Sequence, residues 1–105
     1  MLFGATFKEN CSDTRNSKSI DLAKLLKKKN FKVDFFDPYV SEKYIYKFRN
    51  LKNIKKNYYS AFFFNVSHDK FLEFDIDKLR KKMKKKAIII DIKNIFPTSK
   101  TDFCL

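Results

Sequence analysis

Residues 1–17 read MLFGATFKENCSDTRNS, an apolar run followed by a long polar loop that leads into an amphipathic stretch. This order predicts a strand, a loop and the start of a helix. In an open parallel sheet, ligands bind outside the carboxyl ends of the strands, where such loops lie. The loop, Phe7–Ser17, carries two fixed cations, Lys8 and Arg15, and no glycine. We therefore expect a phosphate to be held here by side-chain charge rather than by a cradle of backbone N–H groups.

The remaining sequence continues the alternation of apolar runs and amphipathic stretches. Apolar runs predict strands, and apolar residues at helical spacing predict helices. The continuous run Ala61–Val66 predicts a strand that is covered on both faces. The expected strands are Leu2–Phe7, Phe31–Phe36, Ala61–Val66 and Ala87–Ile92, and the expected helices are Ser17–Lys29, Ser41–Asn50 and Asp75–Lys85. Because crossovers between parallel strands are right-handed, this order predicts an α/β fold: a three-layer, Rossmann-like open parallel sheet of about four strands, with helices on both faces. We expect one domain over residues 1–96 and a loose tail over residues 97–105.

Composition limits the classes of function. The chain has 105 residues, enough for one core, and a formal net charge of +12. Such a charge attracts phosphate, nucleic acid or an anionic membrane. Lys, Asn, Phe, Ile and Tyr are abundant together, however, and these residues share AT-rich codons. We attribute most of the positive charge to that bias rather than to a nucleic-acid partner.

Several kinds of site are excluded by scarce residues. Gly4 is the single glycine, so neither a dinucleotide fingerprint nor a P-loop can be present. Two cysteines, Cys11 and Cys104, and one histidine, His68, give no disulfide framework and no zinc spacing, so we expect no metal. No signal peptide and no apolar run of membrane-spanning length is present, so we expect a protein of the cytoplasm without a membrane partner.

Four segments carry a resemblance to one known family. The most specific is the loop motif Gly4–Ser17, and three others follow it in order: Val33–Pro38 with its Asp-Pro stop, Val66–Phe71, and Ala87–Asn94. They resemble the C-terminal domain of the UDP-glucose/GDP-mannose dehydrogenases. Val66–Phe71 resembles above all the bacterial branch that acts on UDP-N-acetylhexosamines. Together they cover residues 2–94, most of the chain.

The resemblance implies an activity and a set of site residues. Enzymes of this family oxidise the primary alcohol of a UDP-sugar twice, to a uronic acid, and use two NAD. It implies that Phe7, Lys8 and Lys93 contact the UDP-sugar, and that Arg15 contacts the NAD pyrophosphate. These residue types suit the chemistry, since Lys is a compact charge and Arg forks onto two phosphate oxygens. It implies no catalytic residue in this chain.

The sequence also departs from the family pattern. The NAD-binding domain and the central domain with the nucleophilic cysteine are absent from it, and Cys11 is not that nucleophile. Asn94 stands where glycine is usual, Ser12 replaces a frequent proline, and segment 41–60 is shortened. The chain therefore resembles one domain of a three-domain enzyme. We expect it to be inactive alone and not to bind NAD stably, with a separate chain as a possible source of the missing domains.

Simpler roles compete for the individual residues. Lys8 and Arg15 could form salt bridges with Glu9 or Asp13 instead of holding phosphate. His68 could be a general base, but we expect a hydrogen-bonded structural role. We expect Cys11 to be a half-buried, inert thiol, although two neighbouring cations could favour a reactive thiolate. Asp37 is expected to form an Asp-Pro turn rather than to bind a ribose.

Three functions remain open from the sequence. The first is the UDP-sugar-binding domain of an NAD-dependent dehydrogenase. The second is a basic nucleic-acid-binding module, which scattered cations and the lack of a recognition motif do not favour. The third is a non-functional relic of a truncated gene.

Overall fold

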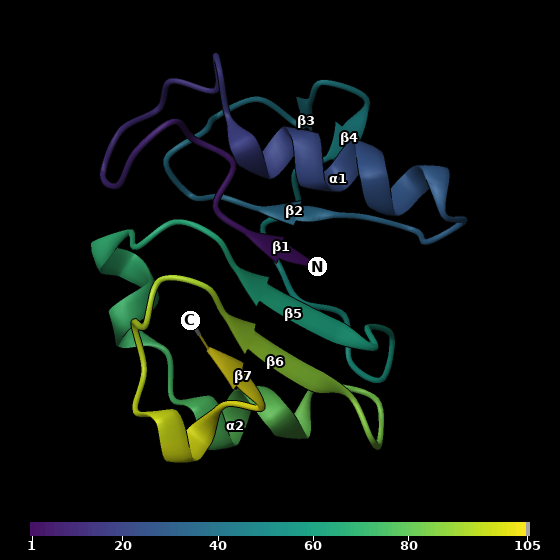
Figure 1. Ribbon diagram of the computed structural model, residues 1–105, viewed down its shortest axis with the longest axis vertical. Helices are drawn as coiled ribbons and strands as arrows, with labels where there is room; N and C mark the ends of the chain where they lie inside the picture. The colour runs from purple at the N-terminus through teal and green to yellow at the C-terminus, as the bar shows by residue number, and fades with distance from the viewer. Residues whose placement is uncertain (105) are drawn as a thin grey trace.

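A computed structural model describes residues 1–104, which form a β-sheet with helices packed against it (Figure 1). Its main sheet has five parallel strands in the order β2-β1-β5-β6-β7. A second, two-stranded antiparallel sheet pairs β3 with β4. The strands are β1 (Leu2–Phe3), β2 (Phe35–Phe36), β3 (Tyr44–Ile45), β4 (Phe48–Arg49), β5 (Ala61–Phe64), β6 (Ile88–Asp91) and β7 (Phe103–Cys104), and the α-helices are α1 (Lys18–Lys28) and α2 (Ile76–Lys81). Short 3₁₀ turns occupy Asp69–Glu73 and Thr98–Lys100.

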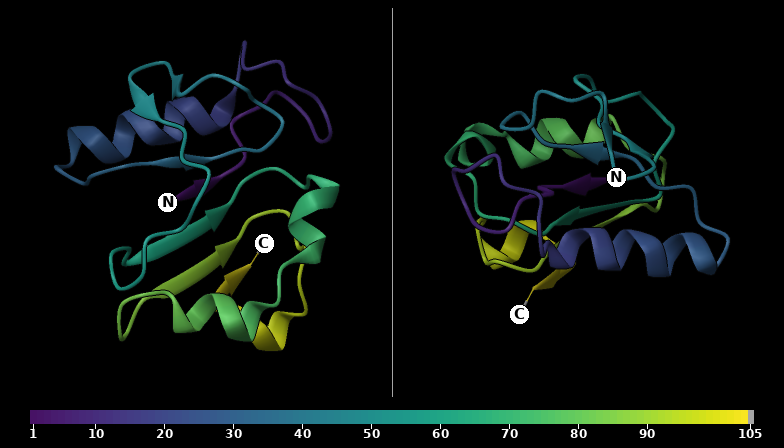
Figure 2. Two further views of the ribbon diagram at one scale, coloured as in Figure 1. Left: turned by 180° about the vertical axis from the view of Figure 1, so that it is seen from behind. Right: turned by 90° about the horizontal axis from the view of Figure 1, so that it is seen from above.

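The two α-helices cover opposite faces of the main sheet, as the views in Figure 2 show. Alternate side chains of β5 explain this, because successive residues of a strand point to opposite faces. Phe62 and Phe64 pack in the cluster that contains α2, whereas Phe63 packs against the cluster that contains α1. The expected three-layer α/β fold is therefore confirmed.

Phenylalanine rings fill the layer beneath α2. Phe3 is fully buried and lies within 4.4–5.8 Å, between ring centroids, of five other rings: Phe36, Phe62, Phe64, Phe71 and Phe74. Offset and edge-to-face pairs of this kind add to the stabilisation from apolar burial. The abundance of phenylalanine in this chain thus serves the core.

Residues 41–50 form the β3–β4 hairpin and not the helix expected from the sequence. Ile45 and Phe48 point inward and are buried, while Tyr46 between them has φ 55, a left-handed conformation that ends a helix. The Asn50 amide then ties the segment together. It donates to the carbonyl oxygens of Asp37, Val40 and Glu42 and accepts the Asp37 N–H.

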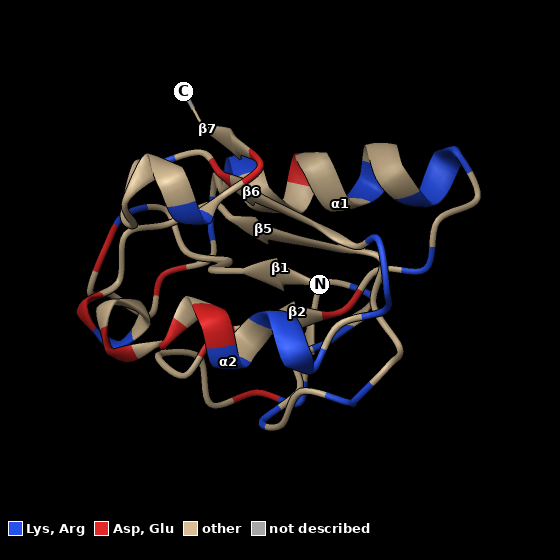
Figure 3. Cartoon of the chain, turned by 90° about the horizontal axis from the view of Figure 1, so that it is seen from below, with Lys and Arg blue, Asp and Glu red and all other residues tan. Residues whose placement is uncertain are grey.

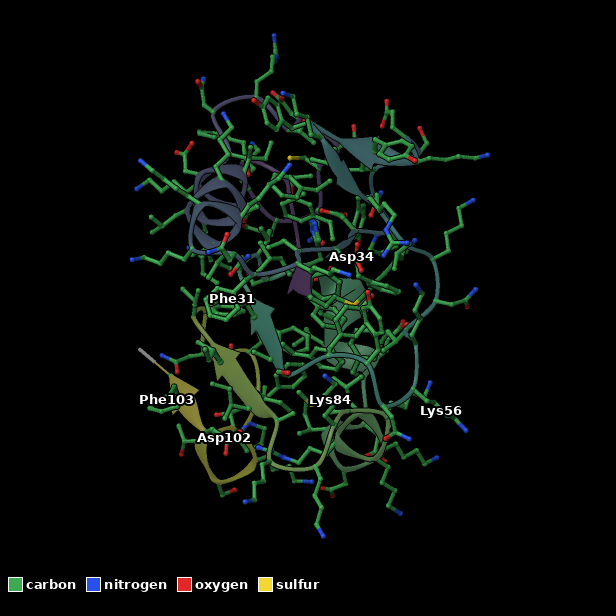
Figure 4. The ribbon with its side chains drawn as sticks, turned by 90° about the vertical axis from the view of Figure 1, so that its right-hand side faces the viewer. Phe31, Asp34, Lys56, Lys84, Asp102 and Phe103 are labelled. Atoms are coloured by element: carbon green, nitrogen blue, oxygen red, sulfur yellow. The ribbon has the colours of Figure 1, made fainter. Side chains whose placement is uncertain are left out.

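Residues 97–104 do not form the expected loose tail, because they contain a 3₁₀ turn and the fifth strand of the main sheet. The Asp102 carboxylate accepts the Ile89 N–H and pairs with Arg80, and Lys100 pairs with Asp77 on α2. Figure 4 shows Asp102 and Phe103 beside β6 at the sheet edge. These anchors are side-chain contacts over a long sequence distance, which local periodicity does not reveal. The domain limit at residue 96 remains a prediction.

Replacing Asp102 with alanine should loosen β7 without unfolding the domain. The Ile89 N–H, helped by Arg80, lowers the pKa of Asp102 below its ordinary value. A carboxyl with a lowered folded pKa stabilises above its unfolded pKa, and this contribution is lost as the pH falls through the lowered value. Amide exchange at Phe103 and Cys104 should accelerate in Asp102→Ala at pH 7, and the difference from wild type should shrink once the pH falls well below 3.8, the ordinary pKa of this carboxyl. The control variant Asp21→Ala should exchange these amides at the wild-type rate. Equal protection in wild type, Asp102→Ala and Asp21→Ala at pH 7 would show that the Asp102 carboxylate does not hold β7 in place.

Asparagine takes most of the left-handed backbone positions in this glycine-poor chain. Positive φ angles occur at Asn10, Asn16, Asn30, Asn57 and Asn94, as well as at Tyr46 and Lys86. Asparagine tolerates this region better than other residues with a side chain. Asn94, with φ 55, therefore adopts a conformation that glycine would also favour.

Candidate functional site

A hollow of about 170 Å³ lies at the carboxyl ends of the central strands. Figure 1 shows the loop after β1, the start of α1 and the segment after β5 converging at this edge. Three of the sequence-predicted site residues, Phe7, Lys8 and Lys93, line the hollow together. They come from the loops after β1 and β6, so only the parallel fold brings them to one place.

Cations predominate around the hollow. Lys18, in the first turn of α1, joins Lys8 and Lys93, and Glu9 is the single acidic residue among the lining side chains. The hollow also borders the N-terminus of α1, whose unpaired N–H groups and dipole favour an anion. Ser17, the N-cap residue, makes no side-chain capping bond. The site is therefore suited to a phosphate group.

The loop that carries Lys8 is held against the sheet by Thr6 and His68. Thr6 Oγ1 donates to the Lys8 carbonyl oxygen at 2.8 Å, and the Asn10 N–H donates to His68 Nδ1 at 2.9 Å. Asn10 Oδ1 in turn accepts the Asp69 N–H. His68 is fully buried, which agrees with the expected hydrogen-bonded structural role. The loop needs no glycine because these bonds fix its shape.

Asp37 anchors the other side of His68. The buried Asp37 carboxylate lies 3.0 Å from His68 Nε2 and accepts the Ala5 N–H at 2.7 Å and the Tyr39 N–H at 2.9 Å. Since Nδ1 of the imidazole is an acceptor, its hydrogen resides on Nε2 and is donated to Asp37. The expected turn role of Asp37 is confirmed, and the carboxylate also joins β1, the turn after β2 and the segment after β5.

Arg15 lies outside the hollow that Lys8 lines. Its guanidinium forms two bonds to the Asp13 carboxylate, at 3.0 Å and 3.1 Å, and its side chain is 86% exposed. These bonds lower the pKa of Asp13 and raise that of Arg15. The structure thus brings Lys8 and Lys93 together but does not bring Arg15 to them. A role for Arg15 toward NAD stays a prediction.

Cys11 is half-buried, and its Sγ donates to the Lys8 carbonyl oxygen at 3.2 Å. This contact supports the loop and agrees with a structural thiol. Lys18 and Asn65 are among the lining residues that were not predicted from the sequence. The sequence does not distinguish Lys18 from the many other lysines. Asn65 could have been noticed, since it is a polar residue within the apolar run from Ala61 to Val66.

A larger hollow, of about 430 Å³, lies at the opposite edge of the sheet, where the strands begin. It is lined mainly by apolar groups such as Met1, Phe31 and Phe63, with Lys32 as its single cation. A doubly charged phosphate ester would lose hydration there without adequate compensation. Size alone therefore does not identify the phosphate site.

Residues 1–104 offer neither a metal-binding cluster nor a membrane-spanning helix. No group of three or more His, Cys, Asp and Glu side chains there could hold a metal ion. No helix there is long and apolar enough to cross a lipid bilayer. Cations occur along both helices and several loops rather than in one stripe (Figure 3).

The sequence of the chain matches the model of a known protein family. A family model described as "UDP-glucose/GDP-mannose dehydrogenase family, UDP binding domain" matches residues 1–98. The chain belongs to this family. The segments that suggested the resemblance thus lie within one continuous match, and the family expected from them is confirmed.

Curated relatives fall in the expected bacterial branch and in archaea. The chain is 34% identical, over 97% of its length, to a UDP-N-acetyl-D-glucosamine 6-dehydrogenase from Salmonella typhi. It is 36% identical, over 90% of its length, to a UDP-N-acetyl-D-mannosamine dehydrogenase from Methanococcus vannielii. These matches cover 25% and 22% of the two relatives, so the chain spans about a quarter of their length.

Solved structures of the family share the fold. The UDP-N-acetyl-mannosamine dehydrogenase from S. aureus superposes with a TM-score of 0.75 and 26% identity, covering 98% of this chain and 24% of that one. A UDP-D-ManNAc dehydrogenase from Pyrococcus horikoshii gives the same TM-score, identity and coverage. The chain thus has the fold of one part of these larger enzymes.

Proposed function

We propose that this chain is the part of an NAD-dependent UDP-sugar dehydrogenase that binds the nucleotide sugar. The observation that carries the proposal is the shared hollow of Phe7, Lys8 and Lys93 at the carboxyl ends of the strands. Two ammonium groups from separate loops suit a diphosphate, and Phe7, which is 61% exposed, offers an apolar ring beside them. Family membership supports the same ligand class.

The oxidation itself would take place with residues from outside this chain. In such an enzyme, the sugar primary alcohol is oxidised twice, to a uronic acid, while two NAD are reduced. The chain has one glycine and therefore no fingerprint for NAD. We propose that it positions the UDP-sugar, that exposed Arg15 is left for the NAD pyrophosphate, and that other domains or a separate chain supply the NAD site and the nucleophile. Alone, the chain should not reduce NAD.

Calorimetric titration of the 105-residue chain with UDP-N-acetylglucosamine tests this proposal. Lys8→Ala and Lys93→Ala should each weaken binding about tenfold or more, since each removes a charge-assisted hydrogen bond. Lys78→Ala is the matched control, because Lys78 is an exposed cation on α2, on the other face of the sheet. Its affinity should stay within about twofold of wild type. Binding that falls equally in all three variants, or no binding by wild type at millimolar ligand, would contradict the proposal.

A further inference from the structure

Asn65 directly follows β5 and is only 8% exposed. Its backbone N–H donates to the Phe3 carbonyl oxygen, which continues the ladder between β5 and β1. Side chains alternate along a strand, so Asn65 points to the same face as Phe63, the face covered by α1. That is where the cationic hollow lies, and Asn65 is one of its lining residues together with Ser19 of α1.

The Asn65 side chain makes no hydrogen bond within the described chain. Neither Oδ1 nor Nδ2 has a partner among residues 1–104, although both atoms are buried. A buried amide without partners destabilises a folded protein, and each such group calls for an explanation. A structural asparagine, such as Asn50, shows the contrast, since its amide makes four hydrogen bonds. Asn65 therefore does not stabilise the fold through its amide.

The surroundings of this amide indicate what kind of group it would meet. The N-terminus of α1 borders the hollow, and the Ser17 hydroxyl there is also buried and without a partner among residues 1–104. Lys8, Lys18 and Lys93 surround the same space. An oxyanion would accept hydrogen bonds from the amide and the helix terminus while the lysines balance its charge.

We propose that Asn65 is a ligand-contact residue whose Nδ2 donates to a phosphate oxygen of the bound diphosphate. This inference rests on the proposed function and deepens it, because it places one phosphate at the N-terminus of α1. A hollow of about 170 Å³ is smaller than a pocket that encloses a whole nucleotide sugar. It holds the phosphate, and the remaining parts of the ligand extend beyond it.

Two substitutions separate a binding role from a structural one. Asn65→Leu keeps the side-chain size and removes the amide, and Asn65→Asp replaces the donor with a carboxylate that repels phosphate. Asn65→Leu should bind UDP-N-acetylglucosamine about tenfold more weakly, and Asn65→Asp weaker still. The melting temperature of unliganded Asn65→Leu should equal or exceed that of wild type, because no hydrogen bond is lost and a buried amide is removed. If the Asn65 amide stabilised the fold, the melting temperature of unliganded Asn65→Leu would be lower than that of wild type.

A pyrophosphate titration identifies the part of the ligand that Asn65 contacts. The affinity for pyrophosphate should fall in Asn65→Leu by a factor similar to that for the UDP-sugar, since the diphosphate is the only part that the two ligands share. Loss of UDP-sugar affinity with unchanged pyrophosphate affinity would overturn the phosphate assignment. Unchanged UDP-sugar affinity in Asn65→Leu, or a lower melting temperature without ligand, would overturn the contact while leaving the proposed function intact. Failure of wild type to bind either probe would overturn both.

Discussion

Asp37→Ala should lower the free energy of unfolding by about 3–5 kcal/mol. The Asp37 carboxylate is 2% exposed and accepts hydrogen bonds from the Ala5 N–H, the Tyr39 N–H and His68 Nε2. Alanine removes all three hydrogen bonds at once. It leaves the Ala5 N–H buried without this partner, and it leaves His68 Nε2 with only the longer contact to Thr6 Oγ1, at 3.3 Å. Urea unfolding followed by circular dichroism would measure the loss.

Two control variants sharpen this test. Asp69→Ala removes an exposed carboxylate in the adjacent 3₁₀ turn and should change stability by less than about 0.5 kcal/mol. Asp37→Asn keeps the size but turns an amide donor toward one of the three donors, so its loss should be intermediate. A fall of under 1 kcal/mol in Asp37→Ala would show that the Asp37–His68 pair does not hold the loops together.

Gly4→Ala should destabilise the fold by about 2–5 kcal/mol, for two separate reasons. Gly4 has φ +98, and a side chain in a left-handed conformation costs about 1–2 kcal/mol. A Cβ at Gly4 would also lie 2.6 Å from the Val66 Cβ, and relieving such crowding costs about 1–3 kcal/mol. Thermal or urea unfolding of the purified variant would test the sum.

A double-mutant cycle with Val66→Gly separates the two causes. Removing the Val66 side chain relieves the crowding but leaves the left-handed conformation at Gly4 unchanged. The double variant should therefore be more stable than the sum of the single changes implies, by about 1–3 kcal/mol. Strict additivity would mean that the backbone at residues 4 and 66 moves apart freely, and that the close contact of these two segments does not shape the hollow.

The sequence predicted the parallel core because its signals are local. The runs around Phe63 and Ile89 are apolar on both faces, as buried strands require, and the helix α1 is amphipathic. Lys8 could be expected at a ligand site because its loop follows a strand, and ligands bind outside the carboxyl ends of parallel strands. The core needed only patterns of a few residues and one rule of topology, whereas Phe7 and Lys93 were implied by the resemblance to the family.

The errors came from residues whose partners are distant in sequence. The β3–β4 hairpin depends on Asn50 bonding back to Asp37, and β7 depends on Asp102 bonding to Ile89. The ion pair between Arg15 and Asp13 is local, and the sequence left it open beside a contact with phosphate. The sequence shows Asn65 as a polar residue within an apolar run, but only the structure shows that its amide has no hydrogen-bond partner among residues 1–104.

The asparagines at left-handed turn positions have a consequence for the kinetics and entropy of folding. Glycine at Asn10, Asn30 or Asn94 would reach the same backbone angles, but it would also give the denatured chain many more conformations to lose. A side chain at each bend narrows that ensemble before any tertiary contact exists, so the ends of the loops meet at a smaller entropic cost. The denatured state of this glycine-poor domain thus has a lower conformational entropy, and less of that entropy is lost on folding.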